Sequence, residues 1–110
     1  MRNWLVLLTL VGLIALGLFL YISQPNKNNK QEAINLCIQL CQNSNLNLTN
    51  GPCLSDDNPQ WNINDWVCDV AHWPRQSVDN LAENQCKDFR EGKANHFVEV
   101  DENCELIRAI

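Results

Sequence analysis

The residues of this chain that could carry chemistry are a cysteine and two histidines in its second half. Cys68 could act as a nucleophile with His72 or His96 as its base and Asp69 nearby, as in an extracytoplasmic thiol-disulfide or hydrolytic enzyme. The two histidines could also hold a metal ion together. A cysteine in a disulfide cannot attack a substrate, and no basic neighbour activates one of the thiols. We therefore expect no catalytic residue, and we interpret each histidine as a structural residue at a strand end.

The six cysteines predict three disulfides in an oxidising compartment. Their number is even, and a domain of about 80 residues buries limited apolar area, for which cross-links are the usual compensation. The alternative is a cytosolic domain with free or metal-bound thiols, but zinc sites usually use closely paired C-x-x-C ligands, whereas the gaps between these cysteines are 3, 11, 14, 17 and 17 residues. Cys37 and Cys41 lie on one face of an expected helix, so each should reach a distant partner, and the rest of the pairing stays open. The six are Cys37, Cys41, Cys53, Cys68, Cys86 and Cys104.

Two glutamates form a weak candidate for a metal site. In the expected C-terminal hairpin Glu99 lies opposite Glu105, a like-charge pair that sheets normally avoid and that a cation such as Ca²⁺ would neutralise. We favour a simpler interpretation, in which the register differs or Arg108 or Arg90 lies between the two carboxylates. We therefore assign no metal and no cofactor.

Three tryptophans and one sequon point toward sugars. Trp61, Trp66 and Trp73 flank an Asn-rich, acidic loop and would suit stacking against sugar rings if they are exposed, but in so small a domain they more often form the core. Asn47 begins the sequence Asn-Leu-Thr, a glycosylation sequon that works only if the domain is translocated by a glycosylating cell. In a chain so rich in asparagine, we interpret this tripeptide as a chance match.

These candidates all follow an apolar segment at residues 4–22 that predicts where the domain lies. The segment has nineteen residues without a charge, and as a helix it would be about 28 Å long, close to the roughly 30 Å of a bilayer core. It is longer than a signal peptide's apolar region and lacks a small-x-small cleavage site. We interpret it as a signal-anchor that spans the membrane once; the alternative is a secreted protein whose mature chain begins near Ser23.

The cysteines set the orientation, because the basic residues on the two flanks of the segment are nearly balanced. A disulfide-rich domain belongs outside the cytoplasm. The expected organisation is therefore an inside tail at 1–3, a transmembrane helix at 4–22, a polar linker at 23–31 and a cysteine-rich extracytoplasmic domain at 32–110.

Local patterns predict an α+β fold for the domain, with two short helices and a C-terminal β-hairpin. In the hairpin we expect Asn103 in the left-handed position of a three-residue turn, which places Val100 opposite Cys104 and Val98 opposite Leu106. The other elements are an amphipathic helix at 31–42, an irregular loop at 43–65, a strand at 66–72, a helix at 79–90 that Asp79 caps and Gly92 ends, and hairpin strands at 96–100 and 104–110.

The charge of the domain excludes one class of partner. All thirteen acidic residues lie at or after Glu32, whereas residues 31–110 contain five basic ones, which leaves about −8. An acidic surface repels phosphates, so we expect no binding to nucleic acid.

Five blocks of the domain carry a likeness to known proteins: GPCLSDD (51–57), WVCDVAHWPR (66–75), VDNLAENQC (78–86), FREGKANHFVEVD (89–101) and NCELI (103–107). They resemble a set of uncharacterised archaeal small proteins that are membrane-anchored or secreted and cysteine-rich. The resemblance implies that the six cysteines and the HFVEV strand form a common scaffold, and it carries over no catalytic residue. Some of those proteins are pilin-like at their amino termini, but residues 4–22 lack the glutamate and the charged processing site of that pattern.

The function expected from the sequence is binding or structural. The chain should be a single-pass protein of the cell membrane, held in the lipid bilayer by residues 4–22, that displays its domain to an envelope protein, a glycan or a cation. The alternatives are the enzyme described above and a pilin-like or secreted envelope component.

Overall fold

The computed structural model describes residues 29–110, which form one small α+β domain. The predicted inside tail, the membrane segment 4–22 and most of the linker lie outside the described residues. Among residues 29–110, no helix is both long and apolar enough to cross a membrane. The predicted α+β class is confirmed.

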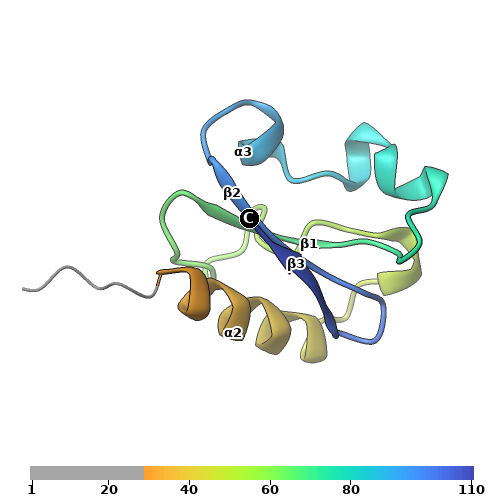
Figure 1. Cartoon of the computed structure of the whole chain (residues 1–110), viewed down its shortest axis with the longest axis horizontal. Coiled ribbons are helices and arrows are strands. Elements are labelled where there is room, and N and C mark those ends of the chain that lie inside the picture. Colours follow the sequence, from red (N-terminus) through yellow and green to blue (C-terminus); the bar gives the residue numbers. More distant parts are fainter. Residues whose placement is uncertain (1–28) are drawn as a thin grey trace, which may run out of the picture.

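A three-stranded sheet forms the centre of the domain (Figure 1). Strand β1 (Trp66–Val70) runs parallel to β2 (His96–Val100), which pairs antiparallel with β3 (Leu106–Ala109). The long helix α2 (Asn29–Gln42) packs on one face. The connection from β1 to β2 lies on the other side and contains η2 (Ser77–Asn80), η3 (Ala82–Asn84) and α3 (Lys87–Arg90).

The core lies between α2 and the sheet. Side chains alternate along a strand, so every second residue points toward the helix. Val70, Val98 and Val100 are fully buried there, and the disulfide between Cys37 and Cys68 joins α2 to β1 among them. The remaining residues of β1 and β2 therefore point to the opposite face, where the candidate site is found.

Three disulfides are present, as predicted, and no cysteine of the described part is free. Cys37 and Cys41 do reach different partners. One disulfide joins α2 to β1, and a second joins α2 to the loop between β2 and β3. The third joins the irregular loop at 43–65 to the β1–β2 connection. The pairs are Cys37–Cys68, Cys41–Cys104 and Cys53–Cys86.

The first helix begins earlier than predicted and the first strand ends earlier. Helix α2 starts at Asn29, so it includes the last residues of the predicted linker. Strand β1 ends at Val70 rather than His72. Its outer edge is covered, because the N–H of Leu54 donates to the carbonyl of Cys68 and the N–H of Val70 donates to that of Pro52.

The single helix predicted at 79–90 is wrong. The segment forms two short 3₁₀ helices and one turn of α-helix, and Leu81 between η2 and η3 has extended backbone angles. Asp79 does not cap a helix that follows it, since its side chain turns back to accept hydrogen bonds from His72 and Gln76. The predicted stop is confirmed, because Gly92 has a φ of 76° and its N–H donates to the carbonyl of Phe89.

The predicted hairpin register is also wrong, although strand 96–100 is confirmed. A bulge between Glu99 and Val100 sets Val100 opposite Leu106 and Glu99 opposite Arg108. The turn is longer than three residues, and Cys104 rather than Asn103 takes the left-handed conformation, with a φ of 64°. Cys104 is held by its disulfide to Cys41. The prediction of a three-residue turn did not include this cross-link.

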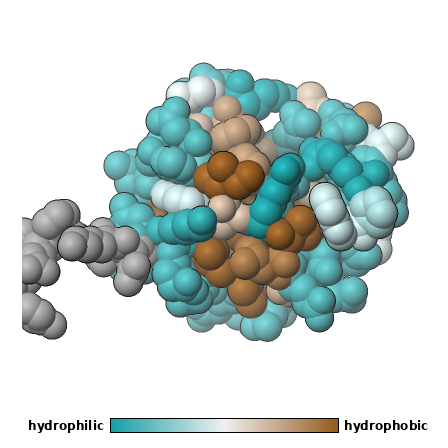
Figure 2. All heavy atoms as spheres, viewed as in Figure 1, coloured by the Kyte–Doolittle hydropathy of each residue, from teal (hydrophilic) through white to brown (hydrophobic). Residues whose placement is uncertain are grey.

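Hydrophobic side chains gather on the face where β3 and α2 lie in front, with hydrophilic residues around them (Figure 2). Near the C-terminus, Leu106 and Ile110 have large hydrophobic side chains that are 46% and 60% exposed.

Candidate functional site

A cavity of about 400 Å³ lies on the face of the sheet that α2 does not cover. We call it the sheet cavity. Its floor is made by residues that alternate with the core residues: Val67 and Asp69 of β1, Phe97 and Glu99 of β2, and Arg108 of β3. Its walls come from the β1–β2 connection, which contributes Arg75, Gln85, Cys86, Phe89 and Arg90.

Two carboxyl groups lie side by side in the floor, because Asp69 and Glu99 are partners in the parallel pairing of β1 and β2. Glu99 is 4% exposed and has two cationic partners. Arg75 Nη1 donates to its Oε2 at 2.9 Å, and Arg108 Nε donates to its Oε1. The buried charge of Glu99 is therefore compensated by hydrogen bonds to both oxygens.

Asp69 has no such compensation. Its Oδ1 is enclosed and has no hydrogen-bond partner among residues 29–110. Burial, followed by the neighbouring charge of Glu99, raises the pKa of Asp69 to about 8, although the nearby Arg75 opposes the shift. Asp69 is therefore protonated at neutral pH, and its carboxylic acid can donate a hydrogen bond.

The cavity gathers positive charge on an acidic domain. Three of the five basic residues in 31–110 line it, namely Arg75, Arg90 and Arg108. The guanidinium of Arg108 lies 5.3 Å from the centre of the Phe97 ring. Its two Nη groups donate no hydrogen bond to any described residue, whereas Arg90 Nη1 donates to the carbonyl of Ala82.

Phe89 and Phe97 give the cavity an apolar wall. Their ring centres are 5.1 Å apart and the ring planes meet at 76°, an edge-to-face arrangement. Phe89 is 42% exposed, which leaves apolar surface open beside the arginines.

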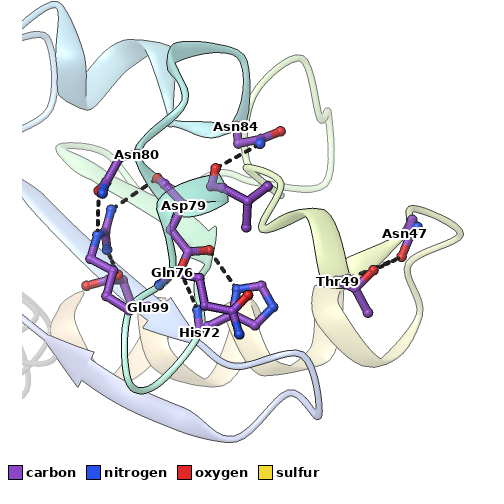
Figure 3. A network of polar contacts seen from close by, with 10 residues as sticks. Asn47, Thr49, His72, Gln76, Asp79, Asn80, Asn84 and Glu99 are labelled. Carbon is purple, nitrogen blue, oxygen red and sulfur yellow. Dashed lines mark hydrogen bonds and ion pairs between the residues drawn. The ribbon is translucent and has the colours of Figure 1, made fainter.

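A buried network behind the cavity holds Arg75 in place (Figure 3). Asp79 is 2% exposed, and its Oδ2 accepts hydrogen bonds from the N–H of His72 and of Gln76, at 3.0 and 2.9 Å. Its Oδ1 lies 2.9 Å from His72 Nδ1. Burial alone would raise the pKa of Asp79, but these hydrogen bonds lower it below its usual value. Arg75 then donates to the carbonyl of Asp79 and to the Asn80 side chain.

The structure does not bring together Cys68, His72 and His96. Cys68 is fully buried in its disulfide with Cys37. His72 follows the end of β1, whereas His96 pairs with Trp66 at the opposite end of the parallel strands. His72 Nδ1 lies beside the Asp79 carboxylate, and His96 Nε2 lies 3.5 Å from Asp65 Oδ2.

The tryptophans do not form one cluster. Trp66 belongs to the core and stacks on the His96 ring at 4.7 Å between centres, and Trp61 donates from Nε1 to the carbonyl of Trp66. Trp73 is 74% exposed and lies after the far end of β1. The sequon residue Asn47 is exposed, and its Oδ1 accepts hydrogen bonds from both the N–H and the hydroxyl of Thr49 (Figure 3).

Glu99 and Glu105, the weak candidates for a metal site, do not lie opposite each other, since the register differs and Glu99 faces Arg108. In residues 29–110 the one group of side chains with metal-ligand spacing is Cys53, Asp56 and Cys86. Both of its sulfurs are in a disulfide with each other, so they are not thiolate ligands.

Sequence reasoning missed the sheet cavity. The alternation of charged and apolar residues in WVCDV and HFVEV placed Asp69 and Glu99 away from the core, but their adjacency depends on the parallel pairing of β1 with β2. Comparison of the chain with protein-family models, with curated proteins and with solved structures gave no match.

Proposed function

We propose that this chain is a single-pass membrane protein whose residues 4–22 anchor the domain outside the cytoplasm, and that the domain binds a small molecule in the sheet cavity. The size of the cavity supports this, because ligand pockets usually enclose about 300–1,000 Å³. The same binding would let the domain recognise one group of a larger envelope component, such as a glycan or another protein.

The observation that carries the proposal is the unpaired Oδ1 of Asp69. An enclosed polar atom without a partner costs about 1–3 kcal/mol, and such atoms are few in folded proteins. Asp69 lines a cavity beside the exposed side chains of Phe89 and Arg90. Oδ1 itself is enclosed, so a rotation of the carboxyl group that turns this oxygen toward the cavity would let a polar ligand supply the missing hydrogen bond.

The three disulfides support the location outside the cytoplasm, because such bonds form and persist in oxidising compartments. The location can be tested by adding protease to intact cells with and without a reductant. We expect the domain to be cleaved in intact cells once the disulfides are reduced. Cleavage only after cell lysis would place the domain inside. A mature chain that is secreted and begins near Ser23 would exclude the anchor, whereas Met1 on the membrane-associated protein would exclude secretion.

Binding in the cavity can be tested with two matched tryptophan variants of the full chain in detergent. Gln85 lines the cavity, so Gln85→Trp should fill it, whereas Gln39 is exposed on α2 and Gln39→Trp should leave it open. Backbone amide resonances would be recorded with a panel of neutral, acidic and basic small molecules.

We expect at least one compound to shift the resonances of Asp69, Phe97 and Glu99 in the unmodified chain and in Gln39→Trp but not in Gln85→Trp. A panel that shifts none of these resonances, or that shifts them equally in both variants, would contradict binding in the cavity.

A further inference from the structure

We propose that the sheet cavity selects an organic carboxylate, a carboxylate group carried on a ring-shaped body, with Arg90 and Arg108 binding the acid group and Phe89 and Phe97 packing against the ring. This inference rests on the proposed function, since it names the class of ligand for the same cavity.

The distribution of charge favours an anion. Residues 31–110 carry an excess of acidic residues, yet three guanidinium groups line this cavity and one ionised carboxylate, Glu99, faces them. A cationic ligand would meet the like charges of these guanidinium groups, and two of them already neutralise Glu99 through a hydrogen bond to each of its oxygens. An anion would be attracted by the same groups.

The donors that remain free suit a carboxylate. Arg75 already donates three hydrogen bonds, to Asn80, Glu99 and Asp79. Arg108 uses Nε for Glu99 and keeps both Nη groups, and a guanidinium binds a planar carboxylate with two parallel hydrogen bonds. Asp69 can add a third donor, because a protonated acid donates to a carboxylate where an ionised one would repel it.

The aromatic wall selects the rest of the ligand. Phe97 forms part of the floor and lies below the Arg108 guanidinium, and Phe89 meets it edge to face. A ring that packs against these two side chains would hold its carboxylate beside Arg108. Hexuronic acids of glycans and aromatic acids share this chemistry, so the experiment must separate them.

The ligand class can be tested by titrating the full chain in detergent with matched pairs and following the amide resonances of Asp69, Phe97 and Glu99. Glucuronate would be compared with glucose, and benzoate with benzyl alcohol and benzylamine; inorganic phosphate tests an anion without a ring. We expect at least one organic acid to bind 10-fold or more tightly than its neutral partner and than phosphate. Glucuronate binding would indicate a glycan source, and benzoate binding an aromatic acid.

Charge variants provide the control. Arg90→Gln and Arg108→Gln should each weaken the binding of the acid by about 10-fold or more. Lys93→Gln removes the same charge outside the cavity, where Lys93 pairs with Glu91, and should leave binding unchanged. If Arg108→Gln does not fold because Glu99 loses a partner, Arg90→Gln still tests the proposal, since the ion pairs of Glu99 are with Arg75 and Arg108 and Arg90 donates to the carbonyl of Ala82.

Three results would overturn the inference. The first is equal or tighter binding of the neutral or cationic partner at the cavity, which would leave the proposed function standing. The second is an equal loss of binding in Lys93→Gln and Arg90→Gln, which would indicate a general charge effect. The third is the absence of any shift at the cavity with every compound, which would contradict the proposed function as well.

Discussion

Glu99 on β2 lies opposite Arg108 on β3 and accepts a hydrogen bond from its Nε, while Arg75 holds the second oxygen of the same carboxylate at 2.9 Å. The side chain of Glu99 is 5% exposed, whereas those of Arg75 and Arg108 are 36% and 47% exposed. The acid is therefore the partner that cannot be solvated if the interaction is broken.

This asymmetry predicts the order of stability among variants. Arg75→Gln combined with Arg108→Gln leaves a buried, unpaired charge and should lower the free energy of unfolding by about 3–5 kcal/mol. Adding Glu99→Gln to this pair should restore most of the loss. Urea unfolding measures all three, with Lys93→Gln as the exposed control; a triple variant no more stable than the double would contradict the assignment.

Stability should depend on pH through Asp69. Its pKa is about 8 in the folded domain and near 4 in the unfolded chain. Between these values the folded state holds more protons, so the free energy of unfolding should fall as the pH rises from 5 to 8. Asp79, whose pKa is lowered, changes stability only at more acidic pH.

The check is urea unfolding from pH 5 to 9 in the unmodified chain, in Asp69→Asn and in the exposed-acid control Glu105→Gln. Asp69→Asn should remove most of the decline and be more stable than the unmodified chain at pH 9, by about 1–3 kcal/mol. The charged groups around Asp69 are Glu99, Arg75, Arg90, Arg108 and Asp79. An equal decline in Asp69→Asn would show that Asp69 is not the source of the pH dependence.

Two glycines with the same backbone conformation should respond differently to alanine. Gly51 has a φ of 66° and Gly92 a φ of 76°, so both substitutions introduce strain of about 1 kcal/mol. A Cβ on Gly51 would lie 2.5 Å from Asp79 Oδ1, whereas nothing lies within 4 Å of one on Gly92. Gly51→Ala should therefore be the more destabilising in thermal unfolding, and equal losses would show that Asp79 moves freely.

The six cysteines should be oxidised in the purified protein. Without reductant the intact mass should be about 6 Da below that of the reduced chain, and no thiol should react with an alkylating reagent.

Removing one disulfide, with Cys53→Ala and Cys86→Ala, should lower the free energy of unfolding by about 2–5 kcal/mol. Peptide mapping tests the pairing itself. A reactive thiol at Cys68 would restore the enzyme alternative.

Features with a local cause could be predicted from the sequence. The helical spacing of Ala33, Cys37 and Cys41 indicated α2, and the alternation in HFVEV indicated β2 with the bounds observed. Gly92 follows the last helical turn with a positive φ. Glycine adopts this conformation at little cost because it has no Cβ, so the stop can be predicted from the residue type alone. Periodicity and turn residues act within a few positions, so they can be recognised without the fold.

Features with a distant cause could not be predicted in this way. The helix expected at 79–90 fails because the Asp79 side chain binds His72, which lies outside that segment. The hairpin register fails because a bulge at Glu99 and a disulfide from α2 act on the turn together. Each depends on a contact between residues that no local pattern links.

The sequence by itself determined the class of the domain, its three disulfides and the side of the strands on which Asp69 and Glu99 lie. Only the tertiary structure decided that these two acids are neighbours, that Glu99 meets Arg75 and Arg108, and that a cavity opens above them. The reason is physical: a strand's alternation sets which face a side chain occupies, whereas pairing of strands far apart in the chain sets which side chains share that face.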